Sequence, residues 1–334
     1  MKRILSLVLL LALLCTLFAC GKKNPDKTPD NGNTETPDNG TTETPDNGEN
    51  NTTTEKTYSF VVVVDSSLGK GNKTTNVGLA IVLDADNKIV AARFDSSEVA
   101  PSLDETGAVV PVESVVSKVE KGESYTGMAA GDWKTQAAIF ENAIIGLTAD
   151  EVANLDATAY AGCTMKTTVP VFKALVAKAV AFENKATFTT AAEFTTGIAM
   201  DMTVSAGRGG KISVGCDIAG LVVADGKILC AALDSVEQSY TIATEGEGDE
   251  ATYSIVAPET VAVSKNDQGA SYVMPAGTWL AQAKAFAGAL VGLDAAGLEA
   301  FEVVSDALTT AGCTMKNTTA GYKVTFIAAL SYVR

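Results

Sequence analysis

The chain has 334 residues, with 40 Asp and Glu against 25 Lys and Arg, and a formal net charge of −15. This acidic balance argues against a nucleic-acid partner. The sequence contains no histidine, which excludes Ser-His-Asp and Cys-His nucleophile systems and removes the commonest metal ligand. A hydrolase is therefore the class of function that the sequence favours least.

The N-terminal residues have the pattern of a signal segment. Lys2 and Arg3 precede an almost entirely apolar stretch, residues 4–19, which is too short to span a membrane comfortably. Cys20 follows directly after Leu-Phe-Ala. This arrangement resembles a bacterial lipoprotein signal, which implies that residues 1–19 are removed and that Cys20 is acylated. The protein is then expected at the extracytoplasmic face of the cell membrane, held by its N-terminal lipid. An ordinary secretory signal that happens to contain a cysteine is the alternative.

Residues 20–57 are predicted to form a tether. The sequence Thr-Pro-Asp-Asn-Gly occurs three times with an eight-residue step, beginning at Thr28, Thr36 and Thr44. The segment has almost no apolar side chains to bury, so we expect it to lack regular structure. Residues 24–57 of this segment, about 34 residues, have a typical end-to-end distance of roughly 30–35 Å, which keeps the folded part close to the membrane.

The rest of the chain contains an internal duplication. The six residues Ala-Gly-Cys-Thr-Met-Lys occur at 161–166 and again at 311–316. Further matches follow the same order in both copies: 88–96 with 227–235, Trp133 with Trp279, Gln136 with Gln282, Phe140 with Phe286, and Lys173 with Lys323. The duplication predicts two homologous repeat domains, 58–185 and 186–334, each long enough to bury its own core.

Within each repeat the predicted strands come first and the helices later. In the first repeat, β-branched runs predict strands at 58–64, 76–83, 88–95 and 109–119, with a turn at 84–87. Asp132 can cap a helix that ends at Gly146, Thr148 begins a capping box, and Thr168 can cap the terminal helix. This order predicts an α+β fold, with an antiparallel sheet followed by helices in each domain.

The second repeat has the same order, with strands predicted at 212–223, 227–234 and 254–263. A two-residue turn at Asp225 and Gly226 would place Cys230 opposite Leu221, so that Cys216 and Cys230 face opposite sides of the sheet. No disulfide is then expected between them. No cysteine pair has the spacing of a metal site, so we predict no metal site and expect the cysteines to be small buried side chains.

Two features of each repeat resemble extracytoplasmic FMN-binding domains, which are found in bacterial electron-transfer lipoproteins. The predicted hairpins at 80–89 and 219–228 are similar to the hairpin near the start of that domain. Gly-Cys-Thr at 162–164 and 312–314 is similar to the Gly-Ala-Thr that carries the flavin there. Ala161 and Ala311 stand where that family has serine, and Cys163 and Cys313 stand where it has alanine.

The resemblance implies a covalent FMN on each repeat, joined through its phosphate to Thr164 or Thr314. Gly162, Gly312, Cys163 and Cys313 would surround the attachment points, and a membrane electron donor and a flavin transferase would be the partners. Small residues ahead of a helix also suit a phosphate, since backbone N–H groups can approach it.

Two functions remain open at this point. In the first, the protein is a tethered electron carrier with one FMN per repeat. In the second, it is a non-catalytic surface binding or structural module whose repeats carry no flavin. Under either function, the protein is expected to be a carrier or a binding protein and not a turnover enzyme.

Overall fold

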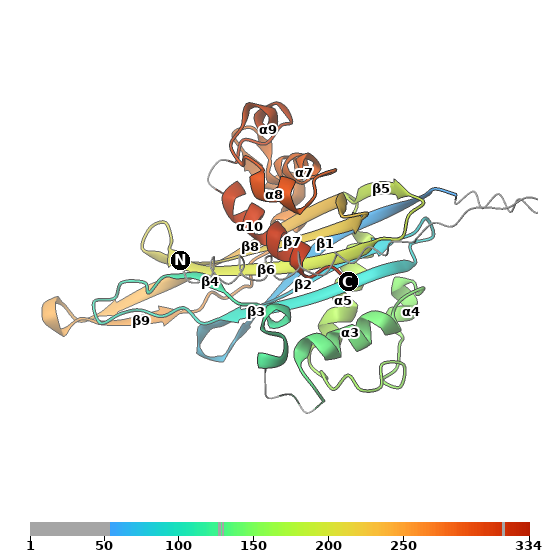
Figure 1. Ribbon diagram of the computed structural model, residues 1–334. Coiled ribbons are helices and arrows are strands. Elements are labelled where there is room, and N and C mark those ends of the chain that lie inside the picture. The colour runs from blue at the N-terminus through green and yellow to red at the C-terminus, as the bar shows by residue number, and fades with distance from the viewer. Residues whose placement is uncertain (1–53, 126–127, 129, 316–317) are drawn as a thin grey trace, which may run out of the picture. The chain divides into compact units, whose positions relative to one another are not determined.

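The computed structural model of the protein describes residues 54–334 except 126, 127, 129, 316 and 317 (Figure 1). The signal segment, Cys20 and most of the predicted tether lie outside the described residues. The first half of the described part ends at residue 185, and the second half begins at residue 186.

The first half begins with strands and ends with helices, as predicted. Its strands are β1 (Lys56–Gly69), β2 (Lys73–Leu83), β3 (Ile89–Val99) and β4 (Val112–Val115). Its helices are α2 (Lys118–Lys121), α3 (Trp133–Ala143), α4 (Ala149–Ala153) and α5 (Val169–Ala181). Lys56 and Thr57 belong to β1, although the sequence assigned them to the tether.

The second half repeats this order and adds the short elements β5, β10, β11 and α9. Its strands are β5 (Ala186–Thr190), β6 (Thr195–Ala206), β7 (Lys211–Ala224), β8 (Lys227–Glu245), β9 (Thr252–Val256), and the two-residue strands β10 (Val273–Met274) and β11 (Gly277–Thr278). Its helices are α6 (Lys265–Gln268), α7 (Trp279–Ala289), α8 (Ala295–Ala300), α9 (Asp306–Thr310) and α10 (Thr319–Ser331).

Side-chain caps fix several helix starts. The Asp132 carboxylate accepts the N–H of Thr135 at the start of α3, and Thr148 and Glu151 form a capping box at α4. These two predictions are confirmed. Thr168 is the residue before α5, but its side chain makes no capping hydrogen bond, because its backbone is already helical there.

The strands form two antiparallel sheets that exchange edge strands between the halves. In the described residues, one sheet has the order β3-β2-β1-β5 and the other β4-β6-β7-β8-β9. The first strand of the second half, β5, therefore pairs with β1, while β4 of the first half pairs with β6. The predicted α+β class with antiparallel sheets is confirmed.

The two sheets pack face to face, and helices cover their outer faces (Figure 1). One apolar layer lies between the sheets and joins Phe60, Val62 and Ala80 of the first half to residues such as Ile218 and Val222 of the second. A second layer lies beneath α3 and α5, and a third beneath α7 and α10. The arrangement is thus helix, sheet, sheet, helix.

The shared layer joins the halves into one body. The contacts of the described residues, from 54 to 334, unite them in a single compact unit. The predicted division into two tandem domains at residue 185 is therefore not confirmed, although the two halves do repeat the same order of strands and helices.

The hairpin of β7 and β8 contains a register shift that the sequence did not predict. A bulge between Val222 and Val223 places Cys230 opposite Val222, not Leu221. Cys216 and Cys230 consequently face the same side, the layer between the sheets, so the predicted opposite orientation is wrong. Both cysteines are nevertheless free, because six residues of strand, about 20 Å, separate Cys216 from the position opposite Cys230.

Two fully buried carboxylates hold the short helices α2 and α6 against the sheets. Oδ1 of Asp95 in β3 accepts the N–H groups of Ser96 and Val119, at 2.7 and 3.0 Å. Oδ1 of Asp234 in β8 accepts those of Ser235 and Asn266, at 2.8 and 3.0 Å. The second oxygen of each carboxylate has no partner among the described atoms. Burial outweighs the hydrogen bonds and raises the pKa of Asp95 and of Asp234 to about 7 each.

These raised pKa values predict that the protein loses stability as the pH rises from 5 to 8. Between the ordinary pKa of 3.8 and the folded value of about 7, the folded state holds protons that the unfolded state has released. We expect the melting temperature to fall across this range, and the double variant Asp95→Asn/Asp234→Asn to flatten the fall. Asp86→Asn, at an exposed turn, is the control. An unchanged pH profile in the double variant would contradict the assignment.

Candidate functional site

Each predicted flavin-attachment threonine is hydrogen-bonded to a buried glutamine. The N–H and the hydroxyl of Thr164 both donate to Oε1 of Gln136 in α3, at 2.7 and 2.8 Å. Thr314 makes the same two bonds to Gln282 in α7, at 2.9 Å each. The sequence analysis matched the glutamines to each other but gave them no role. A buried polar residue on an otherwise apolar helix face, present in both repeats, was the signal that could have found them.

The other predicted site residues shape the same two turns. Gly162 and Gly312 both have φ of +99°, a backbone conformation that favours glycine. Cys163 is half-buried and Cys313 is buried, and each thiol packs against the core of its own half. Burial raises the pKa of both thiols above their ordinary value, which lowers their reactivity.

These turns fit a phosphate-linked flavin only in part. Both threonine side chains are exposed, as an attachment site requires. However, α5 begins at Val169 and α10 at Thr319, five residues beyond each threonine, so the expected helix N-terminus does not lie at the hydroxyl. Each hydroxyl proton is also already donated to a glutamine. The hydrogen bonds between threonine and glutamine give these turns a structural role. They attach the segment before α5 to α3, and the segment before α10 to α7.

The matched tryptophans belong to the core. Trp133 and Trp279 are each 2 % exposed, so neither indole face is available to a flavin ring. Tyr125 and Tyr272 are half-buried, and lysine ammonium groups lie over their rings.

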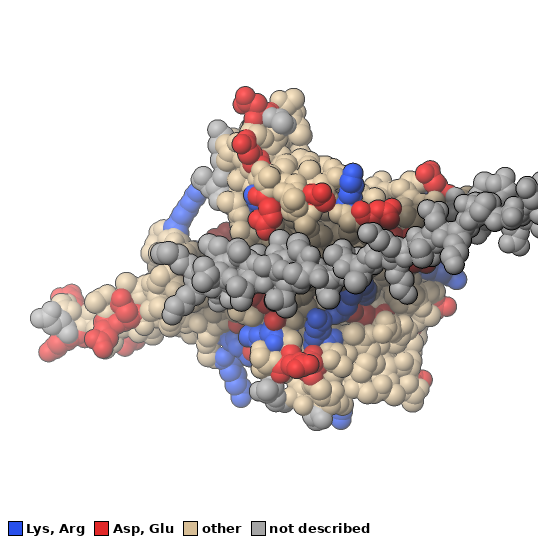
Figure 2. Space-filling model, viewed as in Figure 1, with Lys and Arg blue, Asp and Glu red and all other residues tan. Residues whose placement is uncertain are grey.

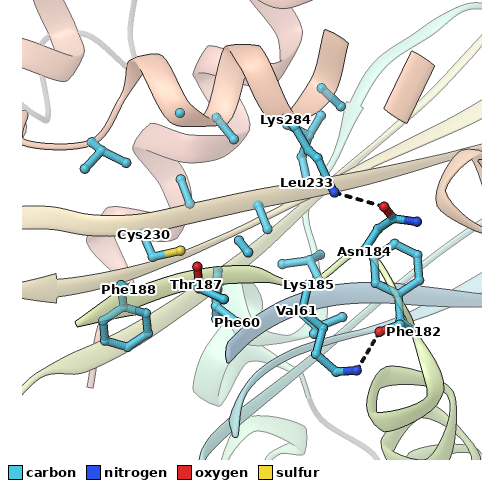
Figure 3. Close-up of a pocket in the computed structure, with 18 of the residues that line it drawn as sticks. Phe60, Val61, Phe182, Asn184, Lys185, Thr187, Phe188, Cys230, Leu233 and Lys284 are labelled. Carbon is cyan, nitrogen blue, oxygen red and sulfur yellow. Dashed lines mark hydrogen bonds between the residues drawn. The ribbon is translucent and has the colours of Figure 1, made fainter. Parts of the chain in front are cut away.

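A cavity of ≈ 490 Å³ lies beneath α7 of the second half, against β5 and β8 of that half and β1 of the first (Figure 3). We call it the second-half cavity. It lies where the layer between the sheets meets the core beneath α7, and most of its wall is apolar: Phe60, Val62, Phe188, Leu229, Cys230, Leu233, Leu280, Ala287 and Val291. The sequence analysis did not predict it.

Two sheet edges border this cavity. β5 is the last strand of its sheet. β8 pairs with β9 only from Thr241 onward, so the preceding part of β8 has no strand partner on that side among the described residues. The open edges make room for the cavity beneath α7.

The equivalent position in the first half holds an ion cluster formed by Arg93, Glu141 and Arg334. Glu141 is 1 % exposed, and its carboxylate oxygens accept from the Arg334 guanidinium at 2.8 and 2.7 Å. Arg93 lies 3.5 Å from the same carboxylate and also donates to the carbonyl of Arg334. Thr196 of β6 exchanges two backbone hydrogen bonds with Arg334, which fixes the end of the chain at this strand edge.

The repeats differ at this position because small side chains in the second repeat replace larger polar ones in the first. Alignment of the two copies places Ala232 at the position of Arg93, Ala287 at that of Glu141 and Gly288 at that of Asn142. In the first half, Arg334 lies between two hollows that flank α3 and lines both of them. In the second half, small side chains at the matched positions leave one apolar cavity. The loss of the charged side chains therefore explains why the cavity beneath α7 has an apolar wall, whereas the hollows beside α3, of ≈ 570 and ≈ 500 Å³, have charged side chains in theirs.

The surface charge also differs between the halves. Figure 2 shows basic side chains gathered around α2 and the start of α3, where Lys118, Lys121 and Lys134 lie near aromatic rings.

No group of three or more Cys, Asp or Glu residues within the described ranges is placed to hold a metal ion.

No helix in the described part of the chain is both long and apolar enough to cross a membrane. Comparison of the chain with known protein families, curated proteins and solved structures finds no match.

The ion cluster predicts a large effect of a small change at Glu141. We expect Glu141→Gln to lower the free energy of unfolding by about 3 kcal/mol, because two partly buried guanidinium groups lose their counterion. Urea denaturation measures this, and Glu105→Gln at an exposed loop is the control. Equal stability of the two variants would show that the cluster does not stabilise the fold.

Proposed function

We propose that this protein is a lipid-anchored extracytoplasmic binding protein, and that it holds an apolar ligand non-covalently in the second-half cavity. The observation that carries the proposal is the cavity itself. Its volume falls within the range of small-molecule sites, and its wall is largely apolar with a few polar groups. Acylation of Cys20 and the tether would keep this binding unit beside the membrane.

The comparison between the halves supports a binding role. The hollows beside α3 are of similar size, ≈ 570 and ≈ 500 Å³, but charged side chains such as Arg334 line both of them. In the second half, alanine at two matched positions and glycine at a third leave the space open. An open apolar space is costly unless something occupies it.

Gly288 offers a direct test. It lies in α7 and lines the cavity, and a Cβ atom added there would meet no atom within 4 Å. We expect Gly288→Phe to fold, because replacing a helical glycine improves helix propensity, and to reduce binding of the neutral apolar dye Nile red at least tenfold as its ring occupies the cavity. Fluorescence titration measures the affinity.

Asn142→Phe places the same ring at the matched position of the first half and is the control. Equal dye binding by both variants and the parent protein would place the dye elsewhere and would contradict the proposal. A second filling variant, Ala232→Arg/Ala287→Glu, introduces the ion pair of the first half and should reduce binding in the same way.

Covalent FMN at Thr164 and Thr314 is the second candidate, and the exposure of both threonines favours it. If it is correct, protein from the native host absorbs in the visible range, and Thr164→Ala and Thr314→Ala each remove one flavin. Each substitution should cost only about 1 kcal/mol of stability, the value of one hydrogen bond. Unmodified masses for both threonine peptides from that host would contradict the flavin proposal and leave the binding proposal standing.

A further inference from the structure

We infer that the second-half cavity selects an amphiphile with an apolar chain and an anionic head group. This inference rests on the proposed binding function and adds the chemical class of the ligand. It follows from how apolar and charged groups are distributed over the wall of the cavity.

The apolar chain is expected between the sheets and α7. Phe60, Val62 and Phe188 come from the layer between the sheets, whereas Leu280 and Ala287 come from α7. Apolar groups thus enclose this part of the cavity from both sides, and a chain buried there would lose its contact with water.

The anionic head group is expected at Lys284. Its ammonium donates to Oδ1 of Asn184 at 3.1 Å, across the cavity from α7 (Figure 3), and forms no ion pair among the described residues. Lys185 is the other charged residue in the wall. Its side chain is directed away from α7, and its ammonium donates to the carbonyl oxygens of Val180 and Phe182 at 2.7 and 2.6 Å, so Lys284 supplies the charge that faces the cavity.

The wall contains no acidic side chain. This composition contrasts with the chain as a whole, in which acidic residues outnumber basic ones by 40 to 25. An anionic head group would therefore be attracted here and repelled by most of the remaining surface, and a cationic head group would be repelled at the cavity itself.

An extended peptide is the other ligand that open strand edges can accept. The cavity favours the amphiphile, because its enclosed apolar space has the size of a small-molecule site and β5 offers only five residues of edge.

The test uses the full-length protein with Nile red bound and measures displacement of the dye. Dodecanoate is expected to displace it, and dodecyltrimethylammonium, which has the same chain and the opposite charge, is expected to fail. Lys284→Gln should weaken dodecanoate about two- to fivefold, the value of one exposed ion pair. Lys185→Gln should have a smaller effect, because the Lys185 ammonium is held by carbonyl oxygens at the end of α5. Lys227→Gln, an exposed lysine outside the cavity, should change nothing.

The outcomes separate this inference from the proposed function. Equal displacement by both amphiphiles, or no effect of Lys284→Gln, would overturn the anionic selectivity, while dye binding sensitive to Gly288→Phe would still support a binding cavity. Displacement by an apolar peptide but not by dodecanoate would overturn it in favour of strand addition. A single-chain anionic phospholipid forms a further arm: stronger displacement by it than by dodecanoate supports a phosphate head group, and the reverse supports a carboxylate.

Discussion

The close contact between the two sheets is the constraint on which the rest of the structure depends. At Gly220 in β7, an added Cβ would lie 2.7 Å from the Val62 side chain and 2.9 Å from Ala80, so only glycine allows the sheets to approach. Because the layer between the sheets takes side chains from both halves, neither half covers this face alone. Strands β4 and β5 pair across the two halves and so strengthen the contact between them. The cavity lies where the two sheets meet, because the strand edges there are unpaired.

Local structure was largely predictable from the sequence, whereas pairing between distant segments was not. The caps at Asp132 and Thr148 and the hairpin turns follow from short-range chemistry, which both repeats display. The pairing of β5 with β1 joins residues far apart in the chain, and nothing in either segment specifies it. One signal was present: Phe60 to Val64 is an unbroken apolar run, and such strands are buried on both faces. Two packed sheets could have been inferred from it.

The candidate site shows why a duplicated sequence should be read for its differences as well as its matches. The shared Gly-Cys-Thr residues build equivalent turns, each closed by a glutamine, and so explain a common architecture. The replacement of Arg93 and Glu141 by alanine distinguishes the two halves, and this difference gives the cavity its apolar wall. A bulge at Val222 and the charge network at Arg334 depend on three-dimensional packing, which no local pattern in the sequence encodes.

The open edges of β5 and β8 have a consequence for the behaviour of the protein in solution. Unpaired strand edges are templates on which a second chain can add a strand, and proteins usually block them with charges, bulges or covering segments. Beside α3, Arg334 pairs with Thr196 and covers part of the edge of β6. In the second half the cavity lies in that place, so a bound ligand would also shield the edges. Occupancy would then govern self-association, and the empty protein would be the form prone to aggregate.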